Sequence, residues 1–206
     1  MGFLQAVAFD TGPSLQCGPV TLRHPQMSDH AAWAKLRADS RDFLVPWEPR
    51  WAIDELERAA FRRRLKRYAQ EIRNDTGYPY FVFRADNHEL VGGLTLAFVR
   101  RGVTQCATLG YWMGQPHAGK GLMTAAVIGV LKHAFDRLQL HRVEAACLPT
   151  NQASIHLLEK VGFTREGYAR AYLCINDRWQ DHILYAILAA DPIAAVNRSG
   201  EPPTRC

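Results

Sequence analysis

The chain has 206 residues, of which 48% are hydrophobic, 22% charged and 10% aromatic, and its formal net charge is +5. This composition argues against a disordered protein and suffices for one well-buried core, whereas two domains would be cramped. The mild positive charge fits an anionic ligand or a ribonucleoprotein partner, although many ordinary enzymes share it.

The five cysteines are scattered without a CxxC pair, which is typical of reduced thiols in a cytoplasmic protein. No signal-peptide pattern is visible, and no run approaches the ~18 apolar residues that suggest a membrane span. We therefore expect a cytoplasmic protein without a membrane partner. We expect an irregular lead-in over residues 1–18, one folded domain over 19–191 and a flexible, Pro-rich tail over 192–206.

The first half of the domain predicts a strand, two helices and a meander of three strands. Residues 19–25 alternate like a first strand, and Ser28 is the expected N-cap of a short helix. Residues 42–51 contain two prolines and predict an aromatic loop, which a long helix follows over about 54–73. After the break at Gly77, period-two patterns predict antiparallel strands at 80–85, 90–98 and 103–113.

The second half predicts a helix, a strand, a second helix and a closing hairpin. Apolar residues recur at helical spacing over 121–138, and a short apolar strand follows at 142–148. The next helix begins at Asn151 and stops at Gly162, and a turn at 176–177 joins the last two strands. A strand–helix–strand unit inside this order predicts an α+β domain with a partly parallel sheet.

A glycine-rich turn, GKG, lies where the last meander strand leads into the central helix. A helix N-terminus attracts anions through its unpaired N–H groups, and Gly119 and Gly121 allow close backbone approach. The turn is not a Walker P-loop, because Gly121 and then Leu122 follow Lys120 where that motif needs Ser or Thr, and it is not a Rossmann fingerprint, because Thr124 stands at the third glycine position. Taken alone, the turn is either an anion site, with Lys120 adding charge, or merely a tight turn.

The segments around this turn resemble a known family. The stretches YWMGQPHAGKGLMTAA (111–126) and HRVEAACLPTNQASIHLLEKVGFTREGY (141–168) resemble the GNAT superfamily of acetyl-CoA-dependent N-acetyltransferases. Two further stretches, FLVPWEP (43–49) and YARAYLCINDRWQDHILYAI (168–187), resemble its RimJ branch. The resemblance implies a mixed, largely antiparallel sheet with a splayed central parallel strand pair, flanked by helices. It also implies acetyl transfer from acetyl-CoA, without a metal, to the N-terminal alanine of a small-subunit ribosomal protein.

The resemblance implies a coenzyme site as well. Backbone N–H groups of the turn would hold the pyrophosphate, and the end of the preceding strand would pair with the pantetheine arm. Asn151 would hold the pantetheine region, while Ser154 would point at the sulfur. The implied coenzyme-binding residues are Tyr111, Trp112, Met113, Ala118, Gly119, Lys120, Gly121, Leu122, Met123, Thr124, Asn151 and Ser154.

Two positions depart from the family pattern. Pro116 stands where the family motif has Gln or Arg. This implies that a side-chain contact with the coenzyme is lost, while the backbone N–H groups still bind the pyrophosphate. Leu158 stands where many relatives carry a tyrosine that acts as general acid. Ser154 is therefore the candidate proton donor to the leaving thiolate, unless it is only a hydroxyl of the first helical turn.

No general base stands out from the sequence. An α-amine with a pKa of ~8 is roughly 10% neutral at pH 7, whereas a lysine is on the order of 0.04% neutral, so an α-amine needs less help. Glu144 interrupts an apolar strand and is the catalytic candidate, although a satisfied structural carboxylate is its alternative. Glu166, Asp181 and His182 are further proton acceptors through water.

The acceptor pocket is expected around the loop at 43–49. Trp47 would wall the pocket, or else plug the space between helices, and Glu48 would attract a cationic peptide N-terminus. Tyr80, Tyr172 and Asp181 are further pocket candidates, although Asp181 and its neighbour His182 are equally well a hydrogen-bonded strand pair.

A basic run on the long helix is the last candidate feature, formed by Arg62, Arg63, Lys66 and Arg67. It predicts either a solvated face or a ribosome contact, and nothing resembles a module that reads nucleic-acid sequence. Two other functions stay open: acetylation of a small amine such as an antibiotic or polyamine, and a non-catalytic ribosome-assembly or acyl-CoA-binding protein. The sequence predicts no oligomeric state.

Overall fold

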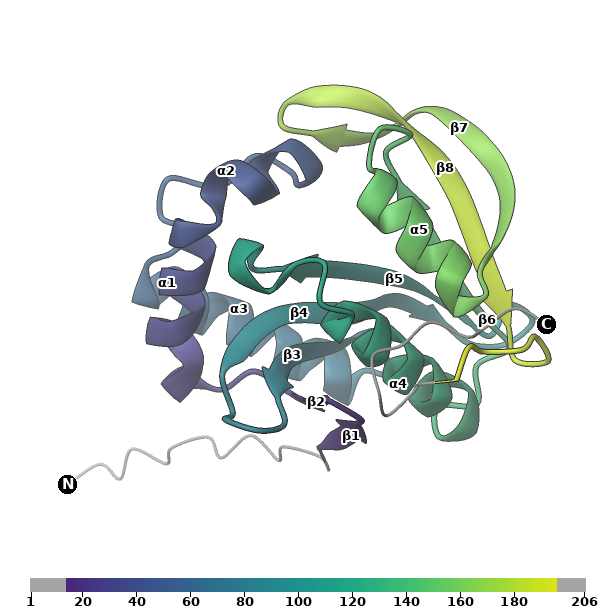
Figure 1. The fold of residues 1–206 in the computed structure, drawn as a ribbon, viewed down its shortest axis with the longest axis horizontal. Coiled ribbons are helices and arrows are strands. Elements are labelled where there is room, and N and C mark those ends of the chain that lie inside the picture. The colour runs from purple at the N-terminus through teal and green to yellow at the C-terminus, as the bar shows by residue number, and fades with distance from the viewer. Residues whose placement is uncertain (1–13, 196–206) are drawn as a thin grey trace.

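Eight strands form one sheet in the computed structural model, which describes residues 14–195 (Figure 1). Their order is β1-β2-β3-β4-β5-β6-β8-β7, and only β5 and β6 run parallel among neighbours in this sheet. The predicted α+β fold with one central parallel pair is confirmed. The strands are β1 (Leu15–Cys17), β2 (Val20–Arg23), β3 (Tyr78–Arg84), β4 (Leu90–Arg100), β5 (Cys106–Met113), β6 (Arg142–Cys147), β7 (Thr164–Ile175) and β8 (Arg178–Leu188).

Helices cover both faces of this sheet. None of those between residues 14 and 195 is long and apolar enough to cross a membrane. The α-helices are α1 (His30–Asp39), α2 (Arg41–Leu44), α3 (Arg58–Arg73), α4 (Leu122–Asp136) and α5 (Gln152–Val161), and the 3-10 turns are η1 (Met27–Asp29), η2 (Val45–Trp47) and η3 (Gln115–His117).

Two apolar clusters hold the layers together, and alternation along β3 contributes to both. Tyr80 and Val82 belong to the main cluster, in which α4 buries ten residues against the sheet. Phe81 and Phe83 point the other way, into a second cluster with α1 and α3. Because both faces of β3 are covered, its sequence is apolar on both faces.

The parallel pair β5–β6 is joined over a short stretch only. Its paired residues are Cys106 with Arg142, Ala107 with Val143, and Thr108 with Glu144. Beyond Thr108, β5 continues beside β4 alone, while β6 continues beside β8. The two strands therefore diverge, as the resemblance implied, and one edge of β5 is left without a partner strand (Figure 1).

Several element boundaries differ from the sequence predictions. α1 begins at His30 rather than after Ser28, because Ser28 lies inside η1. The loop predicted over 42–51 is largely helical, since Pro46 occupies the first turn of η2, where its missing N–H is tolerated. α3 starts at Arg58 rather than near Asp54.

The predicted terminal segments fall mostly outside the described residues. The lead-in over 1–18 overlaps β1, which pairs with β2 and packs against α4. A Cβ at Gly129 of α4 would lie 1.9 Å from the Cys17 sulfur, so this close approach requires glycine. The rest of the lead-in and the tail from residue 196 onward lie outside the described part of the chain.

Candidate active site

A cleft of about 490 Å³ lies where β5 and β6 diverge. Its walls come from the end of β5, the turn that enters α4, the exposed face of α5 and the α2–η2 segment. All twelve residues that the resemblance assigned to the coenzyme line this one cleft. Their contacts with a coenzyme stay a prediction, but the fold brings them together.

The glycine-rich turn has the geometry of an anion site. Gly119 and Gly121 both have φ of +73°, a left-handed conformation that other L-residues adopt only under strain. A Cβ built on either glycine would meet no atom within 4 Å, so the space beside the turn is open. The unpaired N–H groups of the first turn of α4 follow directly, with exposed Lys120 beside them.

The α5 end of the cleft presents a pair of hydroxyl groups. Asn151 is the N-cap of α5, and its side-chain oxygen accepts a hydrogen bond from the Ser154 backbone N–H at 3.1 Å. The Ser154 hydroxyl is thus free of the capping role and lies 2.6 Å from the Tyr111 hydroxyl on β5. Burial raises the pKa of Tyr111, which keeps its phenol protonated. The sequence had suggested only a backbone role for Tyr111, so this pair was missed.

The α2–η2 wall contains both predicted residues of the loop, but one of them in a different role. Trp47 lines the cleft with 36% of its surface exposed, so it is not a plug between helices. The Glu48 carboxylate accepts hydrogen bonds from Arg37 at 2.6 and 3.1 Å and from Trp51 at 2.7 Å. Its charge is therefore balanced inside the wall, and the expectation that it attracts an ammonium group is corrected.

Arg37 is the centre of that wall. Its buried guanidinium lies against the ring faces of Trp51, at 4.3 Å from the ring centroid, and Trp112, at 5.0 Å. Stacking with aromatic faces and a two-point contact with a carboxylate are the contacts that guanidinium prefers. Glu48 of the FLVPWEP stretch, the residue after Trp47, is thus joined to α1 by an ion pair.

Tyr80 does not reach the cleft. Only 4% of its surface is exposed, because it faces α4 in the main cluster and its ring stacks on His24 at 4.6 Å. Burial accordingly raises the pKa of its hydroxyl. The expectation that Tyr80 forms part of the acceptor pocket is therefore wrong for this structure.

Tyr172 and Asp181 lie on the β7–β8 hairpin and do not line the cleft either. Asp181 accepts hydrogen bonds from the Tyr168 hydroxyl at 2.6 Å and the Ala171 N–H at 2.7 Å, which makes it a structural residue of the hairpin. The hairpin register shifts between Ala169 and Leu173, which changes the direction of Tyr172. Its ring lies edge-on to His182.

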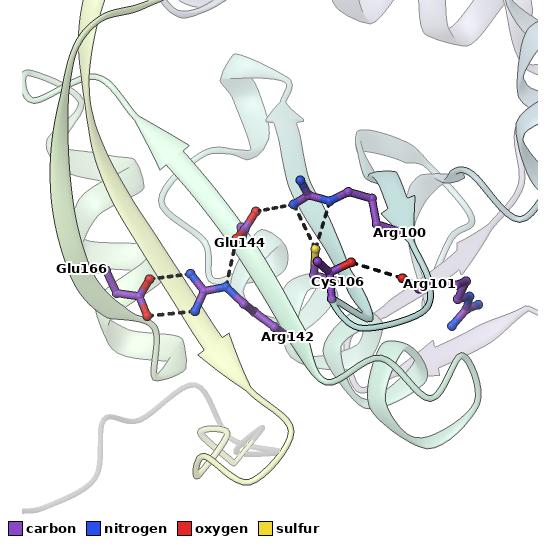
Figure 2. A network of polar contacts seen from close by, with 7 residues as sticks. Arg100, Arg101, Cys106, Arg142, Glu144 and Glu166 are labelled. Carbon is purple, nitrogen blue, oxygen red and sulfur yellow. Dashed lines mark hydrogen bonds and ion pairs between the residues drawn. The ribbon is translucent and has the colours of Figure 1, made fainter.

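Glu144 sits at the closed end of the divergence, opposite Thr108, and is not among the residues that line the cleft. Its carboxylate accepts hydrogen bonds from Arg100 at 3.1 Å and from Arg142 at 2.9 Å, as Figure 2 shows. Arg142 also binds Glu166, and Arg100 contacts the sulfur of Cys106. Both carboxylates thus belong to an ion-pair ladder across the sheet, so the structure favours the structural alternative for Glu144 over a catalytic one.

Further residues of the cleft were not predicted. His117 in η3 is buried, burial lowers its pKa, and its Nδ1 has no hydrogen-bond partner among the described residues. On α5, four-residue spacing from Gln152 through His156 to Lys160 could have indicated one helix face. Phe43 and Leu44 belong to the loop expected around the acceptor pocket, whereas the unpredicted lining residues are His117, Gln152, Ala153, His156, Leu157 and Lys160.

The basic run on α3 lies away from the cleft. Its four side chains are exposed, Arg63 forms an ion pair with Asp54, and Arg67 lies 3.4 Å from the Glu71 carboxylate. A solvated face explains these contacts, and a ribosome contact stays a prediction. Across residues 14–195 no group of three or more His, Cys, Asp or Glu side chains is arranged to hold a metal ion.

Comparison with known proteins decides what kind of cleft this is. Residues 20–164 match the family model described as acetyltransferase (GNAT) domain. The chain belongs to the GNAT acetyltransferase family. It is an acetyl-CoA-dependent N-acetyltransferase, and a protein of similar structure has been solved in complex with CoA-disulfide.

The relatives of this GNAT enzyme include ribosomal-protein acetyltransferases. The chain is 36% identical over 172 residues to the Bacillus subtilis protein named "Probable N-acetyltransferase YjcK", covering 84% of this chain and 95% of that one. It is 33% identical over 165 residues to the Escherichia coli "[Ribosomal protein uS5]-alanine N-acetyltransferase", covering 79% of this chain and 85% of that one.

Solved structures of ribosomal-protein acetyltransferases are also similar to this chain. The Mycobacterium smegmatis RimJ in complex with CoA-disulfide superimposes with a TM-score of 0.79 at 35% identity, covering 87% of each chain. The ribosomal-protein-S5-alanine acetyltransferase of Vibrio fischeri gives a TM-score of 0.80 at 28% identity, covering 86% of this chain and 97% of that one. The GNAT fold is thus present over nearly all the described residues.

Proposed function

We propose that this GNAT enzyme acetylates the N-terminal α-amine of a protein, and that its acceptor is the N-terminal alanine of a small-subunit ribosomal protein. The similarity to the Escherichia coli and Vibrio fischeri relatives, whose names specify this alanine, supports this acceptor class. The main support from the structure is the charge of the cleft itself.

The cleft offers no free carboxylate among its described lining residues. Glu48 is the one acidic residue in that lining, and Arg37 and Trp51 bind its oxygens. The remaining ionisable groups of the lining are basic or weakly acidic: Tyr111, His117, Lys120, His156 and Lys160. A polyamine or a lysine side chain would therefore meet neither an acidic pocket nor a carboxylate base.

An α-amine has the least need of a carboxylate base, because more of it is already neutral. With a pKa of ~8 it is roughly 10% neutral at pH 7, about 250 times the neutral fraction of a lysine, a difference of ~3 kcal/mol. The aromatic wall formed by Phe43 and Trp47 gives a flat, largely apolar surface on which an extended peptide N-terminus would lie. These features together favour a protein α-amine over the small-amine alternative.

The chemistry follows from the divergence of β5 and β6. The unpaired edge of β5 beyond Thr108 offers backbone groups to the pantetheine arm, which would bind as an added strand and carry its thioester into the gap. The amine nitrogen attacks the thioester carbon, a C–N bond forms, and the oxyanion accepts a backbone N–H bond near Met113. The C–S bond then breaks, and the sulfur leaves beside Ser154.

Mass spectrometry of peptides incubated with acetyl-CoA tests this proposal. The set holds one ribosomal peptide with Ala, Ser or Met as first residue, a matched peptide whose N-terminus is blocked and which contains lysine, and a polyamine. We expect the Ala peptide to be acetylated first and the blocked peptide hardly at all. Preferred acetylation of the polyamine or of lysine would refute the proposed acceptor, and no turnover on any amine would favour a non-catalytic protein.

A further inference from the structure

We propose that Tyr111 is a positioning residue for the thiolate site: its hydroxyl donates a hydrogen bond to Ser154 and turns the single Ser154 proton toward the sulfur of the coenzyme. The inference deepens the proposed function and rests on it. It assigns a chemical role to the Tyr111 side chain, which faces the gap between the diverging strands.

The geometry comes from two elements that meet only because the sheet splits. Tyr111 lies on β5 three residues beyond Thr108, the last residue paired with β6. Ser154 lies on the first turn of α5, where the Asn151 cap fixes its backbone. The two hydroxyl oxygens are 2.6 Å apart, a short hydrogen bond between groups that both line the cleft.

The direction of this bond decides what Ser154 can do. A serine hydroxyl has one proton, so a Ser154 that donates to Tyr111 has none left for a sulfur atom. If Tyr111 donates instead, the Ser154 proton is free to face the cleft.

Proton transfer from Tyr111 itself to the thiolate is energetically unfavourable. Moving a proton from a phenol with a pKa of ~10 to a thiolate with a pKa of ~8.5 is about thirtyfold unfavourable, and burial of Tyr111 makes it more so. The surplus proton is instead on the amine nitrogen, which becomes positively charged when it forms the C–N bond. It leaves that nitrogen through water and reaches the thiolate, which Ser154 stabilises meanwhile. Ser154 thus acts as a hydrogen-bond donor rather than as an acid.

A double-mutant cycle tests the coupling of the two hydroxyls. We expect Ser154→Ala to lower kcat about ten- to a hundredfold, as for loss of a hydrogen bond to a charged group. Tyr111→Phe should lower kcat about tenfold with the KM for acetyl-CoA nearly unchanged, and the double variant should equal Ser154→Ala alone. Multiplied losses in the double variant, or a Tyr111→Phe loss confined to KM, would overturn the proposal.

Tyr185→Phe is the matched control. It also removes a partly enclosed phenol oxygen that bonds α5, since Tyr185 donates to Glu159 at 3.1 Å, but Tyr185 does not line the cleft. We expect its kcat to equal that of the wild type. Equal kcat losses in Tyr185→Phe and Tyr111→Phe would indicate a general loosening of α5 and contradict the proposal.

A second measurement needs no acceptor. The ultraviolet absorbance of the thiolate gives the thiol pKa of bound coenzyme A, after subtraction of coenzyme-free protein because the chain has five cysteines. We expect this pKa to be about one unit higher with Tyr111→Phe than with the wild type, equivalent to the tenfold loss. Equal values would overturn the role of Tyr111. If the wild-type enzyme acetylates no peptide, the proposed acceptor is refuted. The thiol pKa of bound coenzyme A would still test the positioning role of Tyr111.

Discussion

The two halves of the cleft are built in different ways. The half that we propose to bind the coenzyme consists of main chain from β5 and the turn before α4, together with the first turn of α5, and its residues form two short runs within 111–124 and 151–154. The half that we propose to bind the acceptor is held by side-chain contacts between elements, as in the contact of Arg37 on α1 with Glu48 after η2. A site made of local backbone geometry can be predicted from a motif, whereas a site made of tertiary contacts cannot.

The acceptor half also depends on the opposite end of the chain. The Asn176 N–H in the β7–β8 turn donates to the Glu48 carbonyl oxygen at 3.1 Å, and Arg50 forms an ion pair with Asp177 at 2.9 Å. The α2–η2 wall and the hairpin thus contact each other beside the cleft. Variants that affect one half without the other are the sharpest way to test this division.

The largest effect is expected in the coenzyme half, from Gly119→Val. The new side chain would enter the space beside the turn and strain a φ of +73°, so N–H bonds to the pyrophosphate should be lost. Loss of two such bonds predicts at least a hundredfold weaker acetyl-CoA binding, roughly 3 kcal/mol, by calorimetry. Gly102→Val carries similar strain at φ of +66° in open space away from the cleft, and its affinity should stay unchanged.

Arg37→Met should be the most damaging change in the acceptor half. It leaves Glu48 partly buried without its charge partner, for which a loss of about 3 kcal/mol in the free energy of unfolding is expected. Urea denaturation measures this loss. Lys35→Met removes an exposed ion pair with Asp39 on the same helix and should change stability by less than about 0.5 kcal/mol. Equal losses would contradict a special role for Arg37.

Trp47→Ala should affect the acceptor alone. Removing its exposed ring face predicts a KM for the peptide about tenfold higher, with the KM for acetyl-CoA unchanged. Trp179→Ala removes a ring that is 69% exposed on β8 and does not line the cleft, and its peptide KM should equal the wild-type value. If both KM values rise for Trp47→Ala, the two halves are not separable.

The smallest effect is expected for Asp177→Asn, which removes the exposed pair with Arg50. Such pairs contribute less than about 1 kcal/mol, so kcat/KM for the peptide should fall less than about fivefold at low salt. Because salt screens exposed charges, wild type and variant should converge at high ionic strength. A difference that persists there would mean that the hairpin contact does more than pair two charges.

The same division explains how much of the fold and the site the sequence could predict. Element types and order followed from periodicity and turns, and all residues of the coenzyme motif line the cleft. Tyr80 was placed wrongly because β3 is apolar on both faces, so its pattern does not tell which face is inside. The direction of Tyr172 depends on a bulge with φ of +44° at Ala171, which no local signal marks.

Two carboxylates illustrate the same limit. Glu144 interrupts an apolar strand, which fits a base as well as an ion pair, and only its contacts with Arg100 and Arg142 decide between them. Glu48 seemed free to attract a cation because Arg37, eleven positions earlier, gives no sign of its partner in the sequence. Whether a carboxylate is paired with a cation depends on its tertiary contacts, which the residue type alone does not reveal.

The short pairing of β5 with β6 has a consequence for exchange with solvent. Amides on the open edge of β5 after Thr108 lack a partner strand, so in heavy water they should take up deuterium quickly while those between β4 and β5 stay protected. Adding coenzyme should slow the fast set selectively. Deuterium uptake at the edge of β5 where the sheet splits would therefore report coenzyme binding directly.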